Sequence, residues 1–370
     1  MKRRIELTIE KMVAKGEALA RHAGKVFFVS GALPNERLLV EITEEKRDFS
    51  RGEVVEIIEA SPLRIKPRCP YYGLCGGCDL QFIDNGQQIL YKEAIIKENL
   101  SRIGRVETDA VEFLPTATAN AWNYRNRVRL QVNKEVGFLA RRSATVVPID
   151  NCLTLCDALN PYFTTKKSAI LGKGLKSVAA FAGDREVSLG AKEVTVSVGS
   201  KRLHTDAKVF FQSNGQILPL LTQYVASEAE GEVVLDLYAG VGTFAAFVEG
   251  EGRRVIAVER DRRCLKLAQK NLKNTEFIPL SLEEWVKRGP LPSVDTIIVD
   301  PPRVGLDKEV LKTLASLGSS TIIYVSCDSV TLSRDVALFG SLGYSLKRVK
   351  PFDMYPQTSH IEAVAILKRG

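Results

Sequence analysis

The chain has 370 residues, of which 45% are hydrophobic and 26% are charged, and it is long enough for two or three globular domains. No apolar run approaches the ~20 residues that cross a bilayer, and MKRRIELTIE at the N-terminus lacks the apolar stretch of a secretion signal. We therefore expect a cytoplasmic protein without a membrane partner. The net charge of +8 arises in residues 64–208, which carry 22 basic and 14 acidic side chains. This excess favours a polyanion partner, although a merely solvated surface would have the same composition.

Residues 5–60 alternate apolar and polar side chains in short runs, which are separated by turn signals at Gly31, Pro34-Asn35 and Gly52. The pattern predicts a small antiparallel β-barrel. Barrels of this size bind oligonucleotides in many proteins and serve as structural caps in others. The alternation alone does not separate these two roles.

Three of the seven cysteines form the pattern C-x5-C-x2-C at Cys69, Cys75 and Cys78. In a reducing compartment such a group favours a metal centre over disulfides, and the third cysteine makes a redox pair at Cys75 and Cys78 less natural. A tetrathiolate site needs a fourth ligand, for which Cys152 and Cys156 are available. Zinc and a [4Fe-4S] cluster both accept four thiolates.

Residues 86–103 have apolar side chains at helical spacing and predict an amphipathic helix or helix pair. Further on, NAWNYRNRVRLQV places Arg125, Arg127 and Arg129 on one face of a strand, next to two aromatic residues. Arginines with neighbouring aromatic rings suit phosphates and stacked bases, although a solvated strand face also carries such residues. Short strands and turns are expected to continue to residue 208.

From Gly231 onward the pattern changes to alternating strands and helices. Val233–Tyr238 predicts an apolar strand, and a turn that contains Gly240 and Gly242 opens a helix. The next strand ends at Glu259, where a carboxylate can accept hydrogen bonds from a ribose diol. This arrangement indicates an adenosine-containing cofactor, and both NAD and S-adenosylmethionine fit it.

Two later strands also end in polar residues. The strand VDTIIV precedes Asp300-Pro-Pro, where two prolines fix a stiff turn and leave carbonyl groups free for a ligand. The run Thr321–Val325 predicts a buried strand that brings Cys327 to the edge where open α/β sheets bind ligands. By position alone, a buried and inert cysteine is the alternative. His360 and Glu362 lie two residues apart, on one side of an extended segment.

Taken together, these segments resemble the RNA 5-methyluridine (uracil-C5) methyltransferase family. The match includes FFQSN at 210–214, DLYAGVGTF at 236–244, DPPRVG at 300–305, YVSCDSVTLSRD at 324–335 and PQTSHIEAV at 356–364. The resemblance implies a TRAM/OB-like β-barrel at 1–63 and a central basic, β-rich RNA-binding domain with an iron-sulfur site at 64–208. It also implies an α/β Rossmann-like S-adenosylmethionine-dependent methyltransferase domain with a mixed seven-stranded sheet at 209–370. The helical part near 84–110 is expected to pack on this catalytic domain.

The methylation of uracil requires a nucleophile and a base. C5 of uracil is a poor nucleophile until a thiolate adds at C6, and Cys327 is the candidate for that addition. The resemblance assigns removal of the C5 proton to Glu362, and it makes His360 an orienting residue. It implies that the cofactor is bound by Gln212, Tyr238, Gly240, Gly242, Glu259 and Asp300, and the RNA by Phe210, Asp300, Arg125 and Arg127.

By the same resemblance, Cys69, Cys75, Cys78 and Cys152 hold a [4Fe-4S] cluster with a structural role, and Cys264 is buried and inert. The barrel and the cluster together most resemble the family's 23S rRNA enzymes, although some tRNA enzymes share both features. The alternatives are an RNA cytosine-5 methyltransferase, an NAD-dependent dehydrogenase and a non-catalytic iron-sulfur RNA-binding scaffold. We expect a monomer without an obligate protein partner.

Overall fold

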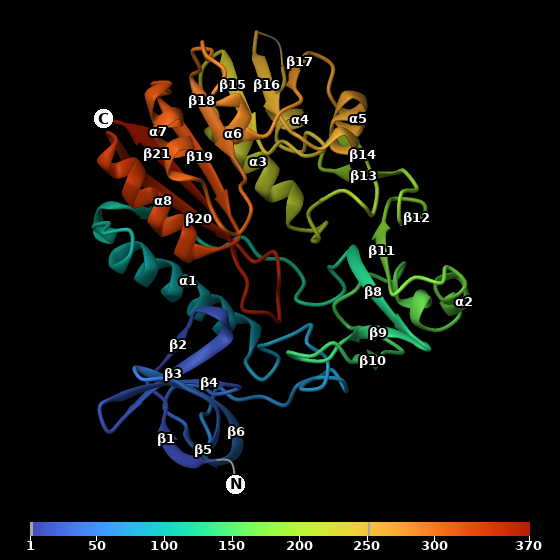
Figure 1. Cartoon of the computed structure of the whole chain (residues 1–370), viewed down its shortest axis with the longest axis vertical. Coiled ribbons are helices and arrows are strands. Elements are labelled where there is room, and N and C mark those ends of the chain that lie inside the picture. The colour runs from blue at the N-terminus through green and yellow to red at the C-terminus, as the bar shows by residue number, and fades with distance from the viewer. Residues whose placement is uncertain (1–2, 251) are drawn as a thin grey trace. The chain divides into compact units, whose positions relative to one another are not determined.

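The computed structural model describes residues 3–250 and 252–370 (Figure 1). The chain divides into an N-terminal unit, made of Met1–Ile95, Phe138–Val147 and Tyr355–His360, and a main unit, made of Ile96–Gly137, Pro148–Met354 and Ile361–Gly370. The division at Ile95 lies within α1 (Asn85–Arg102), the helix that the apolar spacing predicts over 86–103. Among the described residues, no helix combines the length and the apolar character that crossing a membrane requires.

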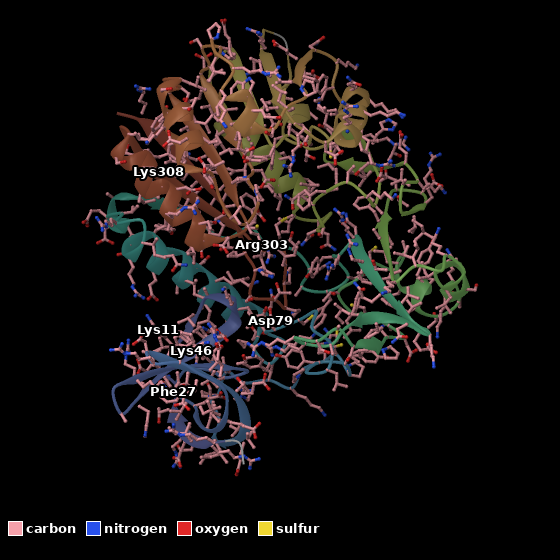
Figure 2. The ribbon with its side chains drawn as sticks, in the orientation of Figure 1. Lys11, Phe27, Lys46, Asp79, Arg303 and Lys308 are labelled. Atoms are coloured by element: carbon pink, nitrogen blue, oxygen red, sulfur yellow. The ribbon has the colours of Figure 1, made fainter. Side chains whose placement is uncertain are left out.

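A six-stranded sheet forms most of the N-terminal unit, because its strands alternate buried apolar and exposed polar residues. The strands are β1 (Arg4–Thr8), β2 (Lys11–Val13), β3 (Glu17–His22), β4 (Lys25–Ser30), β5 (Arg37–Glu45) and β6 (Phe49–Glu59), and a 3-10 turn, η1 (Ala14–Gly16), precedes β3. Their order is β1-β5-β6-β4-β3-β2. The core contains Leu7, Ala18, Val29, Leu38 and Phe27, the last of which is labelled in Figure 2.

One strand pair departs from the antiparallel arrangement that the sequence predicts. Strands β4 and β6 pair in parallel, with Val26 opposite Phe49. The reason is that β6 inserts between β5 and β4 and runs antiparallel to β5. A parallel neighbour cannot be recognised from alternation, since both pairings put side chains on alternate faces.

The main unit is built on a large, mixed sheet. Its strands are β7 (Glu112–Phe113), β15 (Val233–Leu237), β16 (Arg254–Val258), β17 (Thr275–Ile278), β18 (Thr296–Val299), β19 (Thr321–Ser326), β20 (Tyr344–Phe352) and β21 (Glu362–Arg369). The order is β17-β16-β15-β18-β19-β21-β20-β7. Seven of these strands correspond to the predicted seven-stranded sheet. The two-residue strand β7 is added to it from the segment before residue 209, by parallel pairing with β20.

Helices cover this sheet and contribute to its core. They are α3 (Leu218–Glu228), α4 (Ala245–Val248), α5 (Arg262–Asn271), α6 (Leu282–Trp285), α7 (Lys308–Ser316) and α8 (Ser329–Ser341). Figure 1 shows α7 and α8, in orange and red, beside β19 and β20. Every residue of β18 and β19 is buried, as expected for central parallel strands that helices cover on both faces. Ile96 and Leu100, at the C-terminal end of α1, belong to the same core.

Smaller elements complete the main unit. Strands β8 (Arg127–Asn133), β9 (Glu135–Leu139), β11 (Ser177–Ala182) and β12 (Val187–Leu189) form antiparallel pairs, and β13 (Val194–Val198) and β14 (Lys201–Thr205) form a hairpin. The short elements are η2 (Thr108–Ala110), β10 (Val146–Pro148), η3 (Asn160–Phe163) and α2 (Lys167–Leu171). In β8 the buried residues Val128 and Leu130 alternate with Arg127 and Arg129, as the sequence predicts.

Candidate active site

Four neighbouring strands of the main sheet bring polar residues to one edge. Strands β15, β18 and β19 are parallel, so Tyr238, Asp300 and Cys327 follow their carboxyl ends on the same side. Strand β21 runs antiparallel to β19, with Ala363 opposite Ser326, so Glu362 begins its strand at this edge. Residues from four separate sequence motifs are therefore brought together by the topology of one sheet. Ligands of open α/β sheets bind at such an edge.

Cys327 is half-buried and lies between β19 and α8. Asp328 caps the helix, since its Oδ1 accepts hydrogen bonds from the backbone N–H groups of Val330 (2.9 Å) and Thr331 (3.0 Å). Burial, followed by the nearby Glu362 carboxyl, raises the pKa of the Cys327 thiol to about 11. The Arg303 guanidinium opposes these effects and lowers the pKa. The thiol is therefore protonated at neutral pH in the free enzyme.

Two acidic side chains lie close enough to this thiol to raise its pKa. Glu362 is only 2% exposed, and burial and then the neighbouring Asp300 raise its pKa well above its usual value, while Arg303 lowers it. Burial raises the pKa of Asp300 to about 7. Arg303, labelled in Figure 2, is itself exposed and so places a positive charge beside Cys327 and Glu362 from the solvent side. The group can store and release protons near neutral pH.

The glycine turn after β15 forms the predicted cofactor loop. Tyr238, Gly240 and Gly242 all have positive φ angles, of 57°, 57° and 81°. A Cβ at Gly242 would lie 2.6 Å from Leu272 Cδ1, whereas a Cβ at Gly240 would meet nothing nearer than 4.0 Å. Gly242 is thus required for packing against the helix, and the backbone at Gly240 stays open to a ligand.

Glu259 closes this loop at the end of β16. Its Oε2 accepts a hydrogen bond from the backbone N–H of Gly240 (3.0 Å), and its Oε1 accepts one from the N–H of Asp261 (2.7 Å). The Tyr238 hydroxyl donates to Glu283 at 3.5 Å, and partial burial raises the pKa of Tyr238 to about 12. The residues predicted from the glycine turn and from the second strand therefore form one connected site.

Two of the buried oxygen atoms without a hydrogen-bond partner in the described part of the chain belong to the strand before this loop and to a predicted cofactor-binding residue. They are Asp236 Oδ1 and Gln212 Oε1. Asp236 is fully buried, its Oδ2 accepts from the backbone N–H of Ala245 (3.0 Å), and burial raises its pKa to about 7. Unpaired buried acceptors mark the position of a hydrogen-bond donor supplied by a ligand or water. An adenosine cofactor with an amino group and a ribose diol fits this set of acceptors.

Asp236 is a site residue that the sequence reasoning missed. It lies within DLYAGVGTF, but an acidic residue inside an apolar strand gives no periodic signal of its own. Its position could have indicated a role, because it lies in strand β15, four residues before Gly240 of the predicted cofactor turn. A carboxylate is rarely buried without a partner unless it serves a ligand.

The predicted RNA-binding residues lie partly at the surface. The Phe210 ring is 61% exposed, and the Arg127 guanidinium carbon lies 5.8 Å from its centroid. Arg127 also donates to the carbonyl of Ala207 (3.2 Å), and Arg125 Nε donates to the carbonyl of Arg127 (2.9 Å). Arg125 precedes β8 instead of sharing its face with Arg127 and Arg129. An exposed ring beside an arginine is suited to stacking on a base.

The cysteines of the predicted metal centre belong to two units. Cys69, Cys75 and Cys78 lie in the N-terminal unit, where the backbone N–H of Gly77 donates to Cys75 Sγ at 3.4 Å. Cys152 lies in the main unit, with its Sγ 3.3 Å from Thr154 Oγ1. Across residues 3–250 and 252–370, no three His, Cys, Asp or Glu side chains converge as a metal-binding group. The N–H···S contact and the all-thiol donor set are nevertheless compatible with a cluster ligand.

The other predicted residues have simpler surroundings. Burial raises the pKa of Cys156, the alternative fourth ligand. Cys264 is buried in α5, and burial raises its pKa to about 12, which agrees with an inert thiol. His360 belongs to the N-terminal unit, where its ring packs edge-on against Tyr355 at a centroid distance of 6.0 Å. Its orienting role stays a prediction.

The site and the fold define a methyltransferase with a cysteine at the strand edge, and comparisons with known proteins agree. Residues 292–370 match the family model described as tRNA (Uracil-5-)-methyltransferase, and residues 2–55 match the TRAM domain. A 23S rRNA (uracil(1939)-C(5))-methyltransferase RlmD of Shewanella sediminis is 31% identical, over 99% of this chain and 96% of the relative. An uncharacterized RNA methyltransferase of Bdellovibrio bacteriovorus is 33% identical, over 99% of this chain and 95% of that protein.

A solved structure has the same fold. The Pyrococcus abyssi tRNA (uracil-54, C5)-methyltransferase, in complex with S-adenosyl-L-homocysteine, superposes with a TM-score of 0.77 at 22% identity, and covers 98% of this chain and 99% of its own. The chain belongs to the RNA uracil-C5 methyltransferase family. It is an S-adenosylmethionine-dependent enzyme that methylates C5 of uracil in RNA, with a TRAM domain at its N-terminus. This membership decides against the cytosine-5, dehydrogenase and scaffold alternatives.

Proposed function

We propose that the enzyme methylates a specific uridine of 23S rRNA, in the cytoplasm, through a covalent adduct of Cys327 and with Glu362 as the base. The observation that carries the proposal is the placement of Cys327, Asp300 and Glu362 at one edge of the sheet, where both carboxyl groups raise the pKa of the Cys327 thiol and Asp300 raises the pKa of Glu362. A thiol and a carboxyl in this relation are the two groups that methylation of C5 requires.

Cys327 begins the reaction on a uracil that is swung out of its stack. The thiol releases its proton to water, its sulfur bonds to C6, and the C5=C6 electron pair moves to the C5–C4–O4 enolate. Arg303 and the N-terminal end of α8 favour the thiolate, since positive charge stabilises it. S-adenosylmethionine, when bound, supplies the electrophilic methyl group that C5 takes up. Glu259, Asp236 and Gln212 would hold its polar groups.

Glu362 completes the reaction by removing the proton from C5. The electron pair of the C5–H bond re-forms the C5=C6 bond, the S–C6 bond breaks, and Cys327 leaves as a thiolate. A buried carboxylate with a raised pKa is a stronger base than an exposed one, and this suits it to a carbon acid. Asp300 lies beside both groups and contacts the uracil edge or the cofactor.

Replacing Glu362 with Gln separates the two halves of this reaction. Because the amide cannot accept the C5 proton, Glu362→Gln should methylate once and then accumulate a protein–RNA adduct that survives a denaturing gel. The control is Cys327→Ala, which should form no adduct and release no product while still binding RNA. Free methylated RNA in normal yield from Glu362→Gln would remove Glu362 as the base.

The substrate is tested in cells with and without the gene, by mass spectrometry of nucleosides from separated ribosomal and transfer RNA. Loss of 5-methyluridine from 23S rRNA alone is expected, since the Shewanella sediminis relative is a 23S rRNA (uracil(1939)-C(5))-methyltransferase. Loss from the transfer RNA pool would assign the same chemistry to tRNA instead. Unchanged 5-methyluridine in both pools would contradict the proposal.

We further propose that Cys69, Cys75, Cys78 and Cys152 hold a [4Fe-4S] cluster. What supports the proposal is the spacing of three thiols within ten residues and the Gly77 N–H donated to Cys75 Sγ. Such a group would supply a structural crosslink, and no step of the methylation depends on it.

A further inference from the structure

The loop Asp300–Gly305, which follows β18, is tied to helix α8 by side chains that the chemistry does not use. Arg334 Nη2 donates to the carbonyls of Val304 and Leu306, each at 3.1 Å. In return, the backbone N–H of Leu306 donates to Asp335 Oδ2 at 2.9 Å. Three hydrogen bonds thus hold the end of a loop that carries Asp300 and Arg303.

The Asp335 carboxylate also contacts β19, the strand that precedes Cys327. Asp335 is fully buried, and Arg334 Nε donates to its Oδ1 at 2.7 Å. The hydroxyl of Tyr324 donates to Asp335 Oδ2 at 2.6 Å. Tyr324 is fully buried in β19, three residues before Cys327. One buried carboxylate therefore receives hydrogen bonds from the loop, from α8 and from β19.

Gly305 permits the close approach of the loop to this carboxylate. Its φ is +73°, and a Cβ there would lie 2.5 Å from Arg334 Nη2 and 2.7 Å from Asp335 Oδ2. Any larger residue would be strained in its backbone and would also displace the ion pair. The absence of a side chain at Gly305 therefore allows the loop to lie against Arg334 and Asp335.

We propose that Tyr324, Arg334 and Asp335 form a clamp whose function is to hold the Arg303 guanidinium beside Cys327. They are positioning residues, because they act through the loop and do not touch the reacting atoms. Arg303 is exposed and precedes Val304, whose carbonyl Arg334 binds, so the clamp acts on the backbone next to it. The proposal rests on the nucleophilic role of Cys327 given above.

The electrostatic surroundings of Cys327 explain why the position of Arg303 matters. Glu362, Asp300 and Asp328 all disfavour the thiolate, and Arg303 favours it. Arg334 is about half-exposed and Asp335 is fully buried, so solvent partly screens their ion pair and its net contribution to stability is modest. We therefore assign the pair a role in fixing geometry. The clamp keeps Arg303, the one of these four charged groups that favours the thiolate, near Cys327.

The test measures the rate at which iodoacetamide alkylates Cys327 between pH 7 and 10, with the Cys327 peptide resolved by mass spectrometry. The variants are Arg303→Gln, Arg334→Ala, Tyr324→Phe and the double variant Arg303→Gln/Arg334→Ala. A thiol pKa that rises by one unit lowers the thiolate fraction about tenfold at a pH below it. We expect Arg303→Gln to slow alkylation at pH 8 by about that factor. Arg334→Ala and Tyr324→Phe should slow it by about threefold or more.

The double variant distinguishes a clamp from a general loss of packing. If the clamp acts through Arg303, the double variant should alkylate no more slowly than Arg303→Gln alone. Arg369→Ala is the matched control, because Arg369 Nη1 also donates to a backbone carbonyl, that of Ala315 (3.1 Å), elsewhere in the main unit. It should leave the rate unchanged, and binding of S-adenosylhomocysteine verifies that each variant is folded.

Alkylation of Cys327 at the wild-type rate in folded Arg334→Ala and Tyr324→Phe would overturn the proposal, as would additive effects in the double variant. The readout does not require RNA, so it is independent of whether Cys327 attacks uracil. A failure of the nucleophile assignment would instead appear as absence of the adduct in Glu362→Gln. In methyl transfer to a 23S rRNA transcript, the clamp variants should lower kcat with little change in KM.

Discussion

At the scale of single residues, the site concentrates carboxyl groups that resist ionisation. Asp236, Asp300 and Glu362 lie at the ends of neighbouring strands, and burial raises the pKa of each. A ligand that carries positive charge would stabilise their ionised forms and so be bound more tightly. The sulfonium and amino groups of S-adenosylmethionine provide such charge. The acidic groups therefore lower the stability of the free enzyme and favour the cofactor complex.

The pKa of Asp236 gives a testable pH dependence. Because its pKa in the folded protein (about 7) exceeds the ordinary value of 3.8, the folded state binds more protons, and stability falls as pH rises between these values. Asp236→Asn removes the free-energy cost of ionising this buried carboxyl, and the amide oxygen can still accept the hydrogen bond from the N–H of Ala245. Relative to wild type, the free energy of unfolding of Asp236→Asn should rise by about 2 kcal/mol from pH 5 to pH 8.

Urea unfolding of the cofactor-free proteins at both pH values measures this difference. Asp295→Asn is a suitable control, since Asp295 is half-buried and accepts backbone hydrogen bonds at the opposite end of the strands. A pH-independent difference between Asp236→Asn and wild type would show that Asp236 ionises normally. S-adenosylhomocysteine should bind more weakly to Asp236→Asn.

At the scale of elements, a buried ion pair joins distant segments of the N-terminal unit. Glu36 is fully buried and accepts hydrogen bonds from Arg64 Nε (2.5 Å), from the N–H of Leu33 (2.8 Å) and from the N–H of Ser61 (3.2 Å). The Arg64 guanidinium also lies 4.6 Å from the centroid of the Phe82 ring. The turn before β5 and the segment after β6 are thereby fixed to each other.

Removal of one partner leaves the other charge buried and unpaired. Glu36→Ala should therefore lower the free energy of unfolding of the N-terminal unit by about 3–5 kcal/mol. The control is Glu45→Ala, because Glu45 pairs with Arg3 and Lys25 (both 3.1 Å) at the surface, where solvent screens the charges, and its loss should change the stability much less. Proteolysis between residues 31 and 64 of the intact chain reports this local stability. Equal sensitivity of the two variants would contradict the assigned role of Glu36.

At the scale of the whole molecule, strands and turns that have a local sequence pattern can be predicted, whereas contacts between segments far apart in the chain cannot. Strand β19 and the position of Cys327 follow from a continuous apolar run, and the turn at Gly240 follows from its glycines. Strand β7 could not be predicted, because a two-residue strand has no periodicity and depends on β20, more than two hundred residues later. The Tyr324–Asp335 hydrogen bond was also beyond prediction, since a buried aspartate in a helix has the same sequence signal as an exposed one.

The predicted cluster ligands are distributed over the chain: Cys69, Cys75 and Cys78 belong to the N-terminal unit, and Cys152 belongs to the main unit. A metal centre that binds only the folded chain stabilises the folded state, so the binding free energy of a cluster would add to the free energy of unfolding. Loss of the cluster should then affect the stability of the chain before it affects the chemistry at Cys327.

Anaerobic purification decides between the possible metals. We expect a brown protein with four iron and four sulfide per chain, and exposure to air should bleach it and lower its melting temperature. Cys69→Ser, Cys78→Ser and Cys152→Ser should each reduce the iron content, whereas Cys264→Ser should retain it because that thiol is buried in α5. Loss of iron from Cys156→Ser but not from Cys152→Ser would transfer the fourth ligand to Cys156. A colourless anaerobic protein that contains one zinc would exclude the iron-sulfur cluster while leaving the methylation mechanism intact.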